Sequence, residues 1–291
     1  MERVVKRVAA VHDLSGFGRS SLAVVIPILS TMGIQACSLP TAVLSTHTGG
    51  FEGYRFVDLT DSMQGFIDHW TELGIAFDCL YSGFLGSARQ MEILSTWIDS
   101  FRESKPLVII DPVMGDDGKL YSTMTPEIVE KMREFVRKAD VITPNFTEAG
   151  FLLGETCRAA IPETEMKAWM KELSGMGPKT VIVTSVPEEK TESRKSVMAY
   201  NHKDGRYWKA AFANLPVYYP GTGDAFTSVI TASLLQKDSL PIALERAVQF
   251  ITAAIRASYG HEYPCREGVL LERVLPLLNL PVLGNIAEQM N

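Results

Sequence analysis

A glycine-rich turn, Pro-Gly-Thr-Gly-Asp-Ala at residues 220–225, runs directly into an apolar helical pattern over residues 226–235. Two glycines let the backbone N–H groups of a turn converge, and the following helix adds the positive end of its dipole. The turn is therefore suited to hold phosphoryl oxygens. Asp224 is unfavourable in a simple anion site, but it suits a base that takes a proton from an attacking hydroxyl. An ordinary helix start with Asp in its first turn explains the same residues.

Three further carboxylates follow the clearest buried strand pattern, residues 107–110. Asp111, Asp116 and Asp117 stand where that strand should end, and open parallel sheets bind their ligands at this edge. Magnesium typically takes one or two carboxylates and keeps water and substrate phosphates as its other ligands. We interpret Asp111 and Asp116 as candidate metal residues, whereas the Asp-Asp-Gly run that includes Asp117 is equally typical of a turn.

Asn145 and Glu148 open another helical pattern at the spacing of a capping box, which explains both residues without any ligand. A role for Glu148 beside a metal requires its loop to lie next to Asp111 and Asp116. A polar loop with a glycine pair, residues 46–51, follows the second predicted strand, and such loops carry ligands or merely turn. Both interpretations of each segment stay open at this point.

The elements that would position these residues alternate between strands and helices. The predicted strands are residues 4–11, 35–45, 77–81, 107–110, 141–143 and 180–185. The predicted helices are residues 22–32, 54–73, a helix ending at 101, 126–137, one opening at 145, 226–235, 241–258 and 268–278. Segments 197–201 and 206–210 alternate like a hairpin, residues 187–195 resemble a solvated loop, and the tail after 280 has no strong pattern. The sequence predicts one α/β domain over residues 1–291, with a mostly parallel central sheet and an antiparallel edge.

Composition argues against several classes of partner. The formal net charge is −6, whereas nucleic acid or an anionic membrane would call for a basic surface. Four scattered cysteines without zinc spacing, and the lack of a signal peptide, predict reduced thiols and a cytoplasmic location. No apolar run approaches the roughly 20 residues that span a bilayer. Dinucleotide-binding, P-loop, paired-histidine zinc and acyl-transfer serine motifs are also missing.

The order of these motifs resembles the ribokinase superfamily and, within it, the vitamin kinases, from residue 8 to about residue 258. The Gly-Thr-Gly-Asp turn at 221–224 alone suggests the superfamily. Three other motifs resemble the pyridoxal kinases: Asp-Pro-Val-Met-Gly-Asp at 111–116, Thr-Pro-Asn-x-x-Glu at 143–148 and Ser-Thr-His-Thr at 45–48. The resemblance implies a three-layer α/β/α fold and ATP-dependent phosphorylation of the 5′-hydroxyl of pyridoxal, pyridoxine or pyridoxamine.

The resemblance also implies roles for individual residues. Asp224 would be the base, with an anion hole formed by the amides of Gly221, Thr222 and Gly223. The pyridine site would be lined by Asp13, His47, Thr48 and Phe84. The nucleotide would lie by Asp116, Asn145, Glu148 and Thr184, and Mg²⁺ by Asp111, Asp116 and Glu148. A monovalent cation such as K⁺ near Thr143 and Thr184, and a homodimer, are implied as well.

Two positions depart from the pyridoxal kinase pattern, which commonly has Ser and Tyr where this chain has Asp13 and Phe84. The Asp-x-Ser-Gly-x-x-Arg run from Asp13 is instead reminiscent of hydroxymethylpyrimidine kinases, which phosphorylate a similar heteroaromatic alcohol. Residues 45–48 favour pyridoxal. A sugar kinase of the same superfamily and a non-catalytic nucleotide or vitamin sensor also stay open, although a pure binder has no need of Asp224.

Overall fold

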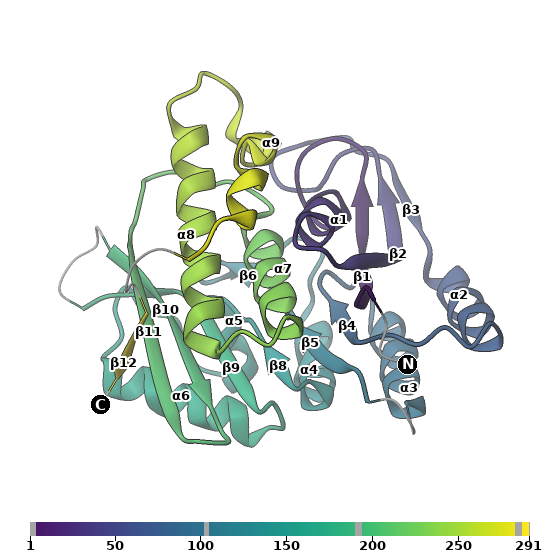
Figure 1. The fold of residues 1–291 in the computed structure, drawn as a ribbon, viewed down its shortest axis with the longest axis horizontal. Coiled ribbons are helices and arrows are strands. Elements are labelled where there is room, and N and C mark those ends of the chain that lie inside the picture. The colour runs from purple at the N-terminus through teal and green to yellow at the C-terminus, as the bar shows by residue number, and fades with distance from the viewer. Residues whose placement is uncertain (1–3, 102–104, 190–193, 283–286, 291) are drawn as a thin grey trace. The chain divides into compact units, whose positions relative to one another are not determined.

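The computed structural model describes residues 4–101, 105–189, 194–282 and 287–290 (Figure 1). The chain divides into two compact units. The first unit comprises residues 1–84, 101–106 and 216–283, and the second comprises residues 85–100, 107–215 and 284–291. Residues far apart in the sequence therefore share a unit. No helix in the described part of the chain is long and apolar enough to cross a membrane.

The first unit contains the strands β1 (Arg7–Ser15), β2 (Gln35–Leu44), β3 (Phe56–Asp58) and β4 (Cys79–Ser82), in the sheet order β4-β1-β2-β3. β1, β2 and β4 are parallel, and β3 runs antiparallel to β2. Residues 8–11 of β1 are all completely buried. Consecutive burial means that both faces of the strand are covered, as is typical of parallel sheets.

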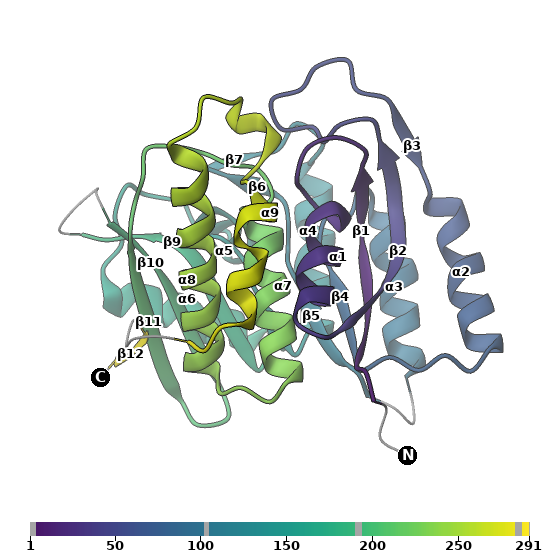
Figure 2. The ribbon, with the colours of Figure 1, turned by 45° about the horizontal axis from the view of Figure 1, so that its top comes forward.

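The helices of the first unit are α1 (Leu22–Thr31), α2 (Thr60–Glu72), α7 (Thr222–Leu235), α8 (Leu240–Tyr259) and α9 (Leu271–Val274). α7 contacts α1 and α8, and it runs alongside α8 in both views (Figure 2). Residues 225–233 of α7 are buried without interruption. A helix that is buried on all sides is held rigidly, so the residues of its first turn are held in place as well.

The second unit contains the strands β5 (Leu107–Ile110), β8 (Val141–Ile142), β9 (Thr180–Pro187), β10 (Arg194–Asn201), β11 (Arg206–Ala213) and β12 (Ala287–Met290). β5, β8 and β9 are parallel, and β10, β11 and β12 continue the sheet in antiparallel pairs. The predicted antiparallel hairpin is thus confirmed. The helices of this unit are α3 (Ala88–Ser100), α4 (Pro126–Phe135), α5 (Phe146–Leu153) and α6 (Glu163–Gly175).

β1 extends further than predicted, through His12 and Asp13 to Ser15, where the sequence predicts a loop from residue 12. The pairing with β2 shifts register between His12 and Leu14, which marks a β-bulge. The polar residue types favoured a loop, but pairing with β2 continues past them. Asp13 therefore lies in a strand, at this β-bulge. Bulges change the direction in which a nearby side chain points.

Two predicted helices are partly wrong. Residues 56–58 form β3, and α2 begins only at Thr60, whose N–H and hydroxyl both donate to Asp58 Oδ1 at 2.7 and 2.5 Å. The helix expected over residues 268–278 is reduced to α9 and a 3₁₀ turn, Leu275–Asn279, with a proline in its first turn. A proline at this place cannot donate the backbone hydrogen bond that would continue α9.

The second unit holds elements that the sequence patterns did not predict. β12 pairs with β11 although the tail after residue 280 has no strong pattern, and α6 was not predicted. The loop predicted over residues 187–195 is shorter, because residue 187 belongs to β9 and residues 194–195 belong to β10. Its middle, residues 190–193, lies outside the described residues.

Candidate active site

Asp224 lies in the first turn of α7, with 13% of its side chain exposed. Its Oδ2 accepts a hydrogen bond from the backbone N–H of Ser21 at 2.8 Å. Burial raises the pKa of Asp224 to about 7, and the nearby charge of Asp13 acts in the same direction. A general base works best when its pKa lies near the working pH, so this carboxyl is suited to accept a proton near neutrality.

Gly221 begins α7 in the left-handed conformation, with φ 80°, and no side chain caps the helix. A Cβ atom at this position would lie 2.1 Å from the backbone oxygen of Arg19. Both observations require glycine. The hydroxyl of Thr222 donates back to the Tyr219 carbonyl at 3.1 Å, so the amides rather than this hydroxyl are available to an anion at the helix start.

Asp13 and Asp224 are joined by Ser21, a residue that the sequence patterns did not single out. The Ser21 hydroxyl donates to Asp13 Oδ1 at 2.5 Å, while its N–H donates to Asp224. Ser21 has φ 50°, a conformation that non-glycine residues rarely adopt. Backbone strain of this kind is typical of functional sites. In the sequence, Ser21 is a serine just before a predicted helix, and this position does not reveal its partners Asp13 and Asp224.

Asp13 itself is 5% exposed, and its other oxygen accepts from the Ser15 hydroxyl at 3.3 Å. Burial raises the pKa of Asp13, and the two serine hydroxyls partly oppose this shift. The structure thus places the predicted substrate residue Asp13 and the predicted base Asp224 in one unit, linked by a single serine.

His47 lies in the same unit, but both of its ring nitrogens are engaged by the backbone. Nδ1 accepts from the N–H of Gly49 at 3.1 Å, so Nε2 carries the proton and donates to the Arg266 carbonyl at 2.7 Å. The ring also packs edge-on against Phe51, with centroids 5.0 Å apart. His47 therefore shapes the loop and offers a substrate only its ring surface, whereas the neighbouring Thr48 is exposed. Phe84, half-buried, follows β4.

The second unit brings together Asp111, Asp116 and Glu148. Glu148 is 3% exposed, and its pKa is raised well above the usual value by burial and by the charges of Asp111 and Asp116. Burial also raises the pKa of Asp116. A divalent cation bound here would offset the repulsion between these carboxylates.

Each oxygen of Glu148 nevertheless already accepts one backbone hydrogen bond. Its Oε1 accepts from the N–H of Met114 at 3.0 Å, and its Oε2 accepts from the N–H of Asn145 at 2.8 Å, in the capping box predicted for α5. Among the residues that the structure describes, no three His, Cys, Asp or Glu side chains form a metal-binding group. The arrangement therefore fits Mg²⁺ that keeps most of its waters, with Glu148 acting through them.

Asp117 belongs to a turn. It and Gly118 both have positive φ, 47° and 73°, and they connect β6 (Gly115–Asp116) to β7 (Lys119–Leu120). Positive φ at both central residues of a two-residue hairpin loop is typical of Asp-Gly. The hairpin holds Asp116 at the end of β6, while Asp117 is exposed.

Asn145 ties this hairpin to α5. Its Oδ1 accepts from the N–H of Glu148 at 2.9 Å, and its Nδ2 donates to the Gly115 carbonyl at 2.8 Å. Thr184 forms an isolated parallel β-bridge with Asn145. Thr143, which precedes Asn145 in the sequence, is buried. Asn145 thus contacts Glu148, Thr184 and Gly115, the residue before Asp116.

We expect Asn145→Ala to lower the free energy of unfolding by about 1–2 kcal/mol, because the cap of α5 and the bond to Gly115 are both lost. Thr125→Ala is the matched control. Thr125 caps α4 by accepting from the N–H of Ile128 at 3.3 Å, and its side chain has no second hydrogen-bond partner among the described residues. Urea unfolding should show a smaller loss for the control, and only Asn145→Ala should raise the Mg²⁺ concentration needed for half-maximal activity. Equal Mg²⁺ requirements would contradict a link between Asn145 and the metal site.

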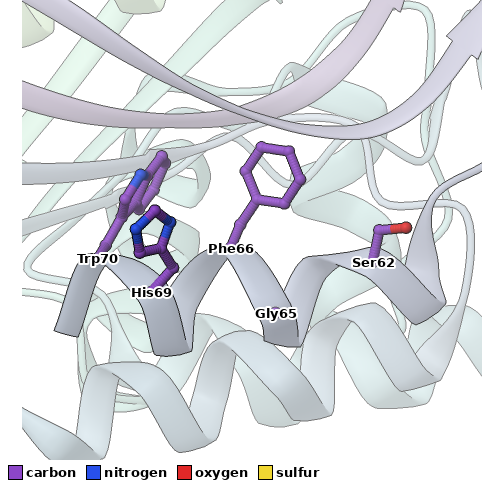
Figure 3. A pocket seen from close by; sticks show the side chains of 5 residues that line it. All are labelled: Ser62, Gly65, Phe66, His69 and Trp70. Carbon is purple, nitrogen blue, oxygen red and sulfur yellow. The ribbon is translucent and has the colours of Figure 1, made fainter. Parts of the chain in front are cut away.

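A separate hollow of about 450 Å³ lies along α2 and contains none of the predicted site residues. Its lining is Ser62, Gly65, Phe66, His69 and Trp70, and Figure 3 shows the larger side chains projecting from the helix at one-turn spacing. It has one aromatic face and few convergent polar groups, so it is a poor candidate for a reaction that moves charge.

A family model of phosphomethylpyrimidine kinases matches residues 26–266 of the chain. The pyridoxine/pyridoxal/pyridoxamine kinase of Bordetella avium is 31% identical over 266 residues, which cover 85% of this chain and 84% of that protein. The chain belongs to the phosphomethylpyrimidine kinase family. The predicted resemblance to pyridoxal kinases is also confirmed, because a pyridoxal kinase of Rubrobacter xylanophilus is 30% identical over 78% of this chain and 79% of its own length.

Solved structures of similar proteins are also kinases by name, and their folds match that of this chain. A Bacteroides thetaiotaomicron protein that bears a provisional phosphomethylpyrimidine kinase name was crystallised with pyridoxal. It is 53% identical, with a TM-score of 0.95 over 98% of this chain and all of that one. Pyridoxal kinase of Lactobacillus plantarum is 28% identical, with a TM-score of 0.84 over 95% and 97% of the two chains. The predicted ribokinase-like fold, with a mostly parallel sheet, an antiparallel edge and helices on both sides, is confirmed.

Proposed function

We propose that the protein uses ATP to phosphorylate the 5′-hydroxyl of pyridoxal, and of pyridoxine and pyridoxamine, giving pyridoxal 5′-phosphate from the aldehyde. The observation that carries the proposal is the largely buried Asp224, whose pKa is raised to about 7 at the uncapped start of α7. The similar Bacteroides thetaiotaomicron protein, crystallised with pyridoxal, supports this choice of acceptor.

In this proposal Asp224 accepts the proton of the 5′-hydroxyl as the hydroxyl oxygen attacks the γ-phosphorus of ATP. The bond from that phosphorus to the β,γ-bridging oxygen breaks, and ADP leaves. The backbone amides of Gly221, Thr222 and Gly223 take up negative charge that develops on the transferring group. Phosphoryl transfer has a loose transition state, so positioning and charge neutralisation account for most of the catalysis. Asp13 and Thr48 would contact the pyridine ring substituents, with Phe84 and the His47 ring packing against it.

Asp111 and Asp116 would hold Mg²⁺, with Glu148 acting through its waters. When bound, the cation neutralises charge on the nucleotide phosphates. Asn145 and Thr184 would lie by those phosphates, and a K⁺ ion near Thr143 and Thr184 belongs to the same proposal. ATP use is supported by the likeness to the kinases of Bordetella avium and Rubrobacter xylanophilus. The pyridoxal kinase of Leishmania donovani, solved with ADP and pyridoxamine, is 19% identical, and this likeness shows the fold alone.

Hydroxymethylpyrimidine phosphorylation is the second candidate, and Asp13 favours it. A buried carboxylate on β1 could accept a hydrogen bond from the ring amino group of that alcohol. The family model is described as phosphomethylpyrimidine kinase, which names a phosphorylated form of that alcohol. Both alcohols would use Asp224 and the same phosphoryl chemistry.

The test is ATP consumption with Mg²⁺ on pyridoxal, pyridoxine, hydroxymethylpyrimidine and ribose. We expect pyridoxal to be turned over with the highest kcat/KM. Fastest turnover of hydroxymethylpyrimidine would favour the second candidate, and fastest turnover of ribose would favour a sugar kinase. Binding of pyridoxal without turnover of any alcohol would indicate a sensor.

Two further features complete the proposal. A homodimer is proposed from the likeness to pyridoxal kinases, and light scattering of the purified protein would test it. A cytoplasmic location is supported by Cys37, Cys79, Cys157 and Cys265, which are all free thiols.

A further inference from the structure

His12 is the most unusual buried group in the first unit. Its side chain is completely buried on β1, and neither ring nitrogen has a hydrogen-bond partner in the described part of the chain. Buried polar atoms are nearly always paired, so two unpaired nitrogens on one ring call for an explanation. Burial lowers the pKa of His12 to about 3, so the ring is neutral.

The position of the ring is fixed by its neighbours. Tyr81 on β4 packs edge-on against it, with centroids 4.4 Å apart. On another side stands Gly83, where a Cβ atom would lie 2.2 Å from Nδ1 of His12. Because Gly83 has no side chain, the imidazole ring of His12 fits beside it. Any side chain at position 83 would collide with the ring.

Nδ1 of His12 lies 3.8 Å from Oδ1 of Asp224. The other oxygen, Oδ2, is already held by the N–H of Ser21. The remaining titratable neighbours are Tyr81, whose hydroxyl donates to the backbone oxygen of Asp224 at 3.4 Å, and Asp13, whose carboxylate binds Ser15 and Ser21. Among the residues that the structure describes, the ion-pair partner of His12 is thus Oδ1 of Asp224.

We propose that His12 is a positioning residue: as Asp224 ionises, Nδ1–H of the neutral imidazole moves within hydrogen-bond distance of Oδ1 and holds that oxygen. With Ser21 on Oδ2 and His12 on Oδ1, both oxygens of the carboxylate are fixed, and a free lone pair is directed at the acceptor hydroxyl. The bond also stabilises the ionised form that acts as the base. This inference rests on the role proposed for Asp224.

The test compares His12→Leu with His12→Asn through the pH dependence of kcat/KM for phosphorylation of pyridoxal. Leu removes the donor while keeping the volume, whereas the amide of Asn keeps an N–H near the place of Nδ1. We expect the acidic limb of the profile to move up by about one pH unit in His12→Leu, because one charge-assisted hydrogen bond is lost. In His12→Asn the limb should stay near its wild-type position, and at high pH the Leu variant should recover most of its rate.

A purely structural His12 would instead lower the rate of both variants equally at every pH, which would overturn the proposal. If His12→Leu does not fold, ¹⁵N NMR of histidine-labelled wild-type protein decides, with His12→Asn used for assignment. We expect a neutral Nδ1–H ring whose shifts follow the titration of Asp224 and stop doing so in Asp224→Asn. An Nε2–H ring would exclude the donor role. An inactive wild-type protein would contradict the proposed function, while the NMR result would still test this contact.

Discussion

Asp224→Asn is expected to lower kcat by roughly 10²–10⁴ while leaving the KM for pyridoxal near its wild-type value. The amide keeps an oxygen that can accept from the N–H of Ser21, so the start of α7 should stay in place. What is lost is the ability to take the proton of the hydroxyl. Steady-state kinetics on pyridoxal measure both constants, and a near-wild-type kcat would remove Asp224 from the role of base.

The same substitution should stabilise the fold above neutral pH. Because burial raises the pKa of Asp224 to about 7, the folded state binds this proton more tightly than the unfolded state does. The contribution of Asp224 to stability is thus fully present below about pH 4 and is lost as pH rises to about 7. Asn does not titrate, so the advantage of Asp224→Asn should grow over this range to about 2–4 kcal/mol.

Urea unfolding of both proteins at about pH 5 and pH 8 measures this difference. Asp68→Asn is the matched control, since Asp68 is exposed and, within the described part of the chain, its side chain accepts only from the side chain of Gln64 on its own helix. The control should show the wild-type dependence on pH. If Asp224→Asn also followed the wild-type dependence, the pKa of Asp224 would not be raised in the folded protein.

Gly221→Ala is expected to lower the free energy of unfolding by roughly 3 kcal/mol or more. The new Cβ would lie 2.1 Å from the backbone oxygen of Arg19 and 3.1 Å from Cα of Ser20. Backbone atoms cannot rotate away as a flexible side chain can, so the start of α7 or the strained segment before α1 must shift. Activity should fall as well, because the amides of the turn move with Gly221.

Gly205→Ala is the control that separates the steric clash expected at position 221 from the cost of a left-handed backbone conformation. Gly205, in the turn between β10 and β11, has a similar φ of 69°, but a Cβ there would meet no atom within 4 Å. Its cost should be limited to the strain of the left-handed conformation, about 1 kcal/mol. Equal losses in the two variants would show that the approach of Arg19 to Gly221 is not close.

The motifs with local geometric rules could be predicted from the sequence. The capping box of Asn145 and Glu148 depends on residues three positions apart, and the Asp117-Gly118 turn depends on adjacent ones. Parallel strands were predicted where β-branched residues form short uninterrupted runs. Strand β12 and the extension of β1 through Ser15 could not be predicted, since pairing with a distant strand stabilises them rather than their own composition.

The contacts of the candidate base also could not be predicted. Ser21 and Asp224 are separated by 203 positions, and no periodic pattern relates them. His12 was not singled out, because a lone histidine beside an apolar run is most often an ordinary core residue. The absence of partners for its ring becomes visible only when its neighbours are known.

The bridge formed by Ser21 has a consequence for how such an enzyme can change its substrate. Asp13 is the candidate for recognising the alcohol, yet its charge raises the pKa of Asp224, and the two share one serine. Replacing Asp13 with a neutral residue would therefore alter recognition and base strength in one step. An enzyme that changed its acceptor alcohol by replacing Asp13 would therefore need a second substitution to restore the pKa of Asp224. Substrate recognition and base strength are thus expected to evolve together.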